Sequence, residues 1–112
     1  MKITKEQLEE KIMPNFKGGD GRYIMRAFDD SDNKLMFGTL EPGCSIGYHT
    51  HTQNSETMYI ISGVATYILE GGVEEVVLPG EVHYCAKGAS HSLQNRGTEN
   101  LMFFAVVGEH HE

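Results

Sequence analysis

Three histidines and one glutamate in this 112-residue chain have a spacing that could hold a metal ion. One residue separates His49 from His51, Glu56 follows five residues later, and His91 comes much further along the chain. In a β-strand, residues i and i+2 point to the same face, roughly 6.6–7 Å apart. Two imidazoles held in this way can converge on one ion, at about 2.0–2.2 Å from each nitrogen. The pair alone would also fit two surface histidines on an edge strand, so its neighbours decide the interpretation.

The neighbours of the histidine pair favour a metal site. The short polar link over residues 52–55 leads into Glu56, and hairpin geometry can bring this carboxylate back beside the imidazoles. Three neutral imidazole nitrogens and one anionic oxygen suit divalent Fe, Mn, Ni, Zn or Cu. We therefore expect one divalent transition metal per chain, bound by His49, His51, Glu56 and His91. An octahedral ion would keep two positions open for substrate or water.

The segments that must position these residues have the patterns of strands. Thirteen glycines against three prolines predict many tight turns. Turn signals such as Glu41-Pro-Gly43 and Pro79-Gly80 separate the apolar runs. The expected strands are 22–28, 34–40, 45–51, 56–62, 65–70, 75–78, 82–85, 91–95 and 101–107. Eight or nine short strands with no helices between them predict an all-β barrel or sandwich.

The N-terminal segment carries the one helix that we expect, over residues 4–13. Thr4 and Gln7 fit a capping box, and Pro14 ends the helical pattern. The helix has a single narrow apolar stripe, so it is expected to pack on the outside of a barrel formed by residues 22–107.

Length and charge limit the classes of function. The chain is long enough for one domain, and we expect residues 1–112 to form it. The net charge is −7, and the lysines and arginines are scattered, so nucleic-acid binding is not expected. No apolar run reaches the length of a membrane span, and the N-terminus has no apolar leader. These features predict a cytoplasmic protein in which Cys44 and Cys85 are reduced, buried thiols, and a disulfide between them is the alternative.

Two long motifs make the sequence resemble the cupin superfamily, in particular its small single-domain metal-binding members. The first cupin motif, G-x5-H-x-H-x3–4-E-x6-G, is matched at every fixed position by Gly43-x5-His49-x-His51-x4-Glu56-x6-Gly63. The second, G-x5-P-x-G-x2-H-x3-N, is matched by Gly80-x5-Ala86-x-Gly88-x2-His91-x3-Asn95. Ala86 stands where the family usually has proline. Proline restricts the unfolded chain, so the change affects the rigidity of the turn and removes no metal ligand.

The resemblance implies a double-stranded β-helix, which is a jelly-roll barrel. It also carries over His49, His51, Glu56 and His91 as the four metal ligands. Cupins with this ligand set resemble dioxygenases, isomerases, decarboxylases and lyases. A metalloenzyme that acts on a small oxygen-rich substrate is therefore our first hypothesis. The alternative is a non-catalytic module that binds or senses a sugar or another small ligand.

Catalysis would need an acid, a base or an anion clamp near the open metal positions. Besides Glu56, the expected assistants are Tyr48, Tyr84 and Lys87, and Gln53 and Arg26 are further candidates. No spacing singles out any of them. The motifs leave His83 unassigned, and a frayed tail is expected to contain His110 and His111.

Apolar residues on both faces of two strands, 56–62 and 101–107, predict a second covering surface, which is either another sheet or a partner subunit. If Glu56 faces inward, alternation places Met58 and Ile60 inside, and it places Tyr59 and Ile61 outside. A monomer of this size rarely leaves such an apolar surface in water. We therefore expect a homodimer.

Overall fold

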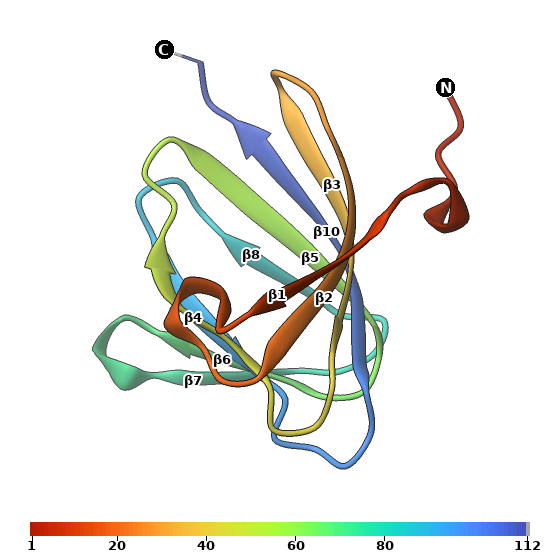
Figure 1. Ribbon diagram of the computed structural model, residues 1–112. Coiled ribbons are helices and arrows are strands. Elements are labelled where there is room, and N and C mark those ends of the chain that lie inside the picture. Colours follow the sequence, from red (N-terminus) through yellow and green to blue (C-terminus); the bar gives the residue numbers. More distant parts are fainter. Residues whose placement is uncertain (112) are drawn as a thin grey trace.

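The computed structural model describes residues 1–111, and in this range the chain forms two antiparallel sheets that face each other (Figure 1). The six-stranded sheet has the order β1-β2-β3-β10-β5-β8, and the four-stranded sheet has the order β4-β9-β6-β7. The strands are β1 Glu10–Pro14, β2 Arg22–Asp29, β3 Asn33–Leu40, β4 Ser45–Thr50, β5 Asn54–Ser62, β6 Ala65–Leu69, β7 Glu74–Val77, β8 Val82–Cys85, β9 Ser90–Gln94 and β10 Leu101–Glu109. This arrangement confirms the all-β jelly roll that the sequence predicts.

The nine strands predicted after residue 22 are all present, and their ends lie within two residues of the predicted ends. Alternation along β5 is also confirmed. Met58 and Ile60 are buried between the sheets with Glu56, whereas Tyr59 and Ile61 are 47% and 49% exposed on the outer face. The strand therefore carries one candidate metal ligand on its inner side and an apolar surface on its outer side.

The helix predicted over residues 4–13 is wrong. The chain instead forms a 3-10 turn at Lys5–Gln7, in which the Thr4 backbone N–H donates to Gln7 Oε1 at 2.7 Å, and then continues as β1. A short isolated helix is only marginally stable in water. As a strand, by contrast, β1 pairs with β2 over all of its own residues, Glu10–Pro14. Throughout residues 1–111, the helical segments are too short to traverse a lipid bilayer.

The end of the chain also differs from the expected frayed tail. β10 continues to Glu109, and His110 Nε2 lies 3.0 Å from Ser55 Oγ beside β5. His111 Nε2 lies 2.9 Å from Asp32 Oδ1, just before β3. These contacts tie the last described residues to the ends of the neighbouring strands.

The apolar core lies between the two sheets and draws on both of them. Its largest fully buried side chains include Tyr23, Tyr67, Phe103, Leu40, Met58, Ile60 and Leu101. Among the buried polar residues, Asn95 is 2% exposed, and its Nδ2 donates to the carbonyl oxygens of Leu40 and Glu99, both at 2.8 Å. It therefore closes a turn between the strands, as expected for an asparagine at such a position.

A close approach of two backbones holds the loop after β1 against β4. A Cβ at Gly47 would clash with the carbonyl oxygen of Lys17, and a Cβ at Gly19 would clash with that of Ser45. Glycine at both positions lets the 3-10 turn Phe16–Gly18 lie directly on β4. The contact brings Lys17 to the space between the sheets.

Candidate metal centre

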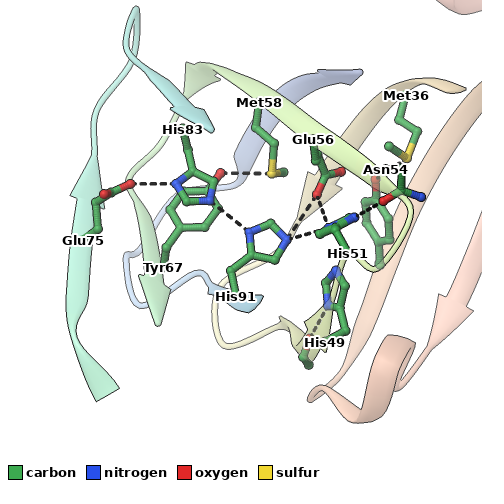
Figure 2. Close-up of polar contacts among 12 residues, drawn as sticks. Met36, His49, His51, Asn54, Glu56, Met58, Tyr67, Glu75, His83 and His91 are labelled. Atoms are coloured by element: carbon green, nitrogen blue, oxygen red, sulfur yellow. Dashed lines mark hydrogen bonds and ion pairs between the residues drawn. The ribbon is translucent and has the colours of Figure 1, made fainter. Parts of the chain in front are cut away.

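The four residues of the predicted metal site meet in a cavity between the sheets (Figure 2). His49 lies on β4, His51 follows directly after this strand, Glu56 lies on β5 and His91 on β9. Each side chain offers one ligand atom, and the four atoms lie within 4.8 Å of one another. β5 belongs to the six-stranded sheet and the other two strands to the four-stranded sheet, so the cluster bridges both layers.

The separations between the ligand atoms suit a single ion. His51 Nε2 lies 3.1 Å from His91 Nε2. Glu56 Oε1 lies 3.4 Å from the first of these nitrogens and 3.2 Å from the second. Two ligands at right angles, each roughly 2.1 Å from an ion, would stand about 3.0 Å apart. Both this geometry and the donor set of three imidazoles and one carboxylate fit a divalent transition metal.

Hydrogen bonds at the outer nitrogens of two histidines determine which nitrogen of each ring can bind a metal ion. His49 donates from Nδ1 to the carbonyl oxygen of Gly47 at 2.7 Å, and His51 donates from Nδ1 to Asn54 Oδ1 at 2.6 Å. The amide of Asn54 is itself oriented, because its Nδ2 donates to Glu109 Oε1 at 3.2 Å. In a neutral imidazole, a proton on Nδ1 leaves the lone pair on Nε2. Both rings are therefore held in the tautomer that a metal at the centre requires.

His91 is contacted from its other side by a residue that the sequence left unassigned. His83, on β8, is 3% exposed, and its Nε2 lies 2.9 Å from His91 Nδ1. Its own Nδ1 lies 2.6 Å from Glu75 Oε1 on β7 (Figure 2). The ring stacks on Tyr67, with 3.6 Å between the ring centroids. His83 therefore lies behind a candidate ligand rather than in the cavity.

The pKa values of these groups follow from burial and from the Glu56 carboxylate. Burial lowers the pKa of His49 and of His83, which favours neutral rings. Burial alone would raise the pKa of Glu56, but hydrogen bonds to His51 and His91 outweigh it and bring the pKa to about 2. The hydrogen bond with Glu56 raises the pKa of His51. Acceptor atoms that face one another at the centre thus need a cation between them, either a proton or a metal ion.

Competition between protons and metal predicts the pH dependence of binding. We expect metal affinity to fall as the pH decreases through about 6.5, because imidazoles must be neutral to act as ligands. Because the pKa of His51 is raised, protons begin to compete with the metal at a pH above the ordinary histidine pKa. Glu56 stays ionised down to about pH 2, so its protonation does not contribute to the loss of metal affinity. Chelator competition between about pH 5 and pH 8 measures the affinity. An affinity that stays constant over this range would contradict the histidine ligands.

The cavity has a volume of about 320 Å³ and two kinds of lining. Its apolar residues are Phe16, Tyr23, Met36, Ile46, Met58, Leu93 and Val107. Polar residues around the metal cluster are Lys17, Asp29, Asp30, Asn33, Lys34, Thr50, Thr52, Asn54 and Glu109. The charge of Lys17 is among the influences that lower the pKa of His51, so this ammonium group acts on the cluster. A cavity of this size can enclose a small molecule.

Three of the expected catalytic assistants lie elsewhere. Tyr48, Tyr84 and Lys87 are exposed, and they are not among the described residues that line the cavity. Tyr84 lines a separate pocket on the outer side of His83. Arg26, a further candidate, donates from Nη1 to the carbonyl oxygen of Leu8 at 3.0 Å. Of the four residues expected to take part in catalysis, only Glu56 lies with the cluster.

Comparisons with known proteins agree with this fold. A family model described as the Cupin domain matches residues 36–107. The oxalate-binding protein of Thermotoga maritima is 27% identical over 113 residues, which cover 96% of this chain and 93% of that protein. A crystal structure described as a predicted oxalate decarboxylase of the same organism has a TM-score of 0.89 and 26% identity, with 97% of this chain and 99% of the other covered.

A more distant structure is similar in fold alone. The sugar phosphate isomerase of the cupin superfamily from Silicibacter pomeroyi superposes with a TM-score of 0.81 at 20% identity, and the match covers 97% of this chain and 76% of the other. The family model, by contrast, spans both motifs and all four residues of the cluster. The chain therefore belongs to the cupin-domain family.

Proposed function

We propose that the chain binds one divalent transition ion through His49, His51, Glu56 and His91 and uses it to hold a small oxygen-rich acid. The observation that carries this proposal is the convergence of four ligand atoms within 4.8 Å on the wall of a cavity of about 320 Å³. A bound metal would supply a Lewis-acid centre for the oxygens of the ligand. The side chains of the cavity would orient the ligand and exclude water from it.

Oxalate, or an acid of similar size, is the ligand class that we propose. The relative from Thermotoga maritima is named for oxalate binding, and a similar structure is described as a predicted oxalate decarboxylase. In this chain, Lys17 and Lys34 line the cavity and can attract a small anion despite the net charge of −7. The apolar lining lowers the local dielectric constant, which strengthens the attraction between these charges and the ligand.

The contribution of Lys17 can be measured by removing its charge. We expect Lys17→Gln to weaken oxalate binding about fivefold, which corresponds to about 1 kcal/mol for a partly exposed charge pair, and to leave the metal content unchanged. Isothermal titration of metal-loaded protein with oxalate measures the dissociation constant, and elemental analysis measures the metal content. Lys87→Gln is the matched control, because Lys87 is exposed and does not line the cavity. Oxalate binding of equal strength in metal-free protein would contradict the proposal and favour a metal-independent binding module.

Catalysis on the same acid is the second candidate function. Asp29 and Glu109 line the cavity together with the metal cluster and could transfer a proton to or from a bound molecule. The reaction could belong to the dioxygenase, isomerase, decarboxylase or lyase class. Protein loaded separately with Fe, Mn, Ni, Zn or Cu ions can be incubated with oxalate, keto acids and sugar phosphates. Product formation would support an enzyme, and inert protein that still binds oxalate would support the non-catalytic alternative, a binding or sensing module.

We also propose that two copies of the chain associate through the outer face of the six-stranded sheet. The strand register places Phe37, Phe104, Tyr59 and Val82 in one row across β3, β10, β5 and β8. Tyr59 is 47% exposed and Val82 is 55% exposed. An apolar row of this length on the outer face of a sheet is suited to a self-complementary two-fold interface.

The homodimer can be tested by light scattering. We expect a mass of twice the 12.5 kDa of the chain, and a shift to the monomer mass when Tyr59→Lys and Val82→Lys are combined. Tyr48→Lys is the control, because Tyr48 is 52% exposed on β4 in the other sheet. A monomer mass for the unaltered protein at micromolar concentration would rule out this association.

A cytoplasmic location stays a prediction of the sequence. The two cysteines, Cys44 and Cys85, are free; Cys85 is buried as expected, whereas Cys44 is only half-buried. Free thiols are typical of a reducing compartment, which supports the prediction.

A further inference from the structure

Two polar side chains, those of His83 and Glu75, lie behind His91 and outside the proposed metal site. We propose that Glu75 and His83 are positioning residues, which hold His91 in the tautomer with its proton on Nδ1 and so direct its Nε2 lone pair at the metal. This inference rests on the metal binding proposed above. It assigns to the two residues a role in metal affinity, although neither is a ligand of the ion.

The Glu75 carboxylate, at the outer end of the hydrogen-bonded series Glu75–His83–His91, sets the direction of both hydrogen bonds. A carboxylate can only accept, so the 2.6 Å contact with Glu75 Oε1 requires the proton of a neutral His83 to be on Nδ1. His83 Nε2 is then an acceptor, and the 2.9 Å contact requires His91 Nδ1 to donate. The remaining nitrogen, His91 Nε2, is left without a proton, 3.1 Å from His51 Nε2. Figure 2 shows the three side chains in this order.

The positions of the two residues give the link a fixed geometry. His83 is 3% exposed and stacks on Tyr67 with an interplanar angle of 17°, so its ring has little freedom to turn. It lies on β8 of the six-stranded sheet, whereas Glu75 and His91 lie on β7 and β9 of the four-stranded sheet. His83 therefore spans the two layers behind the cluster, and its two nitrogens are both occupied. A carbonyl oxygen fixes the same tautomer in His49, and an amide oxygen fixes it in His51. All three histidines of the cluster thus carry the proton on Nδ1 and direct Nε2 at the metal.

Two substitutions of His83 separate hydrogen bonding from packing. His83→Phe keeps a ring that can stack on Tyr67 but removes the acceptor, and we expect it to raise the dissociation constant for Zn(II) about 10- to 100-fold. His83→Gln loses the ring but keeps an acceptor, and we expect its dissociation constant to stay within about threefold of the unaltered value. Thermal melts of the metal-free variants first establish that both fold. The reverse order of affinities, or an equal loss in both, would overturn the proposal.

A charge reversal at Glu75 tests the direction of the hydrogen bonds without altering the core. In Glu75→Lys the ammonium group donates to His83 Nδ1, which moves the His83 proton to Nε2 and the His91 proton to the metal side. We expect a fall in Zn(II) affinity of at least about tenfold. Glu70→Lys is the matched control, because Glu70 lines the same outer pocket and carries the same charge, and it should change the affinity much less. An equal loss in both variants would assign the effect to charge alone and overturn the role of Glu75.

A spectroscopic measurement separates failure of this inference from failure of the metal site. Long-range ¹H–¹⁵N correlation spectra of the metal-free protein at about pH 8, where free imidazoles are neutral, report the protonated nitrogen of each histidine. We expect protons on Nδ1 of both His83 and His91. A His91 ring that carries its proton on Nε2 and none on Nδ1 would overturn the inference even if the protein binds metal. The expected tautomers in a protein that binds no metal would uphold the hydrogen-bond direction and reject the proposed function.

Discussion

Replacing His49 and His51 together with alanine is expected to abolish binding of a divalent transition metal and the stabilisation that the metal provides. The change removes two of four ligand atoms that lie within 4.8 Å of one another and leaves only Glu56 and His91 in the cluster. Metal present at about 1,000 times its dissociation constant stabilises a folded protein by about 4 kcal/mol. For a domain of this size, its loss should lower Tm by about 10 °C or more. Elemental analysis and thermal melts measure the two effects.

The tail histidines provide a matched control for this double variant. His110 and His111 are also close neighbours in sequence, but they contact Ser55 and Asp32 rather than the cluster. Their replacement with alanine should leave one ion per chain. The protein should be purified without chelators or nickel affinity columns, so that its metal content reflects the site itself. Full metal occupancy in the His49/His51 variant would contradict the ligand assignment.

The cluster itself was predictable because its geometry depends on local rules. The spacing of His49 and His51 places both side chains on one face of a strand, and the alternation along β5 places Glu56 inward with Met58 and Ile60. The resemblance to the two cupin motifs assigned the distant His91 to the same site. Strand periodicity and the turn signals likewise gave nine strand positions to within two residues.

The surroundings of the cluster depend on contacts that no local pattern encodes. Lys17 reaches the cavity because the loop that contains it packs on β4, and Glu75 reaches His83 across two sheets. The N-terminal segment became β1 because the edge of β2, the next strand along the chain, competes with helix formation. Tertiary contacts of this kind override local propensity.

Alternation could nevertheless have placed three of the residues that the sequence left open. β8 reads Val82-His83-Tyr84-Cys85, and its burial alternates, so an inward Cys85 implies an inward His83 and an outward Tyr84. In the same way, an inward His49 implies that the preceding Tyr48 points away from the cavity, and Tyr48 is 52% exposed. The period of the strand thus argues against both tyrosines as catalytic assistants and favours His83 as a neighbour of the site.

Gly47→Ala is expected to destabilise the fold and weaken the metal site together. A Cβ at this position would clash with the carbonyl oxygen of Lys17, and the nearest atoms that it would meet are all backbone atoms of Lys17 and Gly18, which leaves little room for relaxation. Overpacking of this kind costs about 2–3 kcal/mol, which corresponds to a fall in Tm of about 10 °C for a small domain. Because the Gly47 carbonyl accepts the hydrogen bond from His49 Nδ1, the same shift should disturb a ligand. Thermal melts and chelator competition measure the two effects.

The matched control is Gly108→Ala on β10. Its added Cβ would lie 3.6 Å from Asn33 Oδ1, which is an ordinary contact, and Gly108, like Gly47, lies in a strand with φ outside the left-handed region. We therefore expect it to change the free energy of unfolding by no more than about 0.5 kcal/mol. If Gly47→Ala is as stable as this control, the backbone contact between the loop and β4 does not hold the loop in place. If Gly47→Ala is destabilised but binds metal with unchanged affinity, the carbonyl of residue 47 does not position His49.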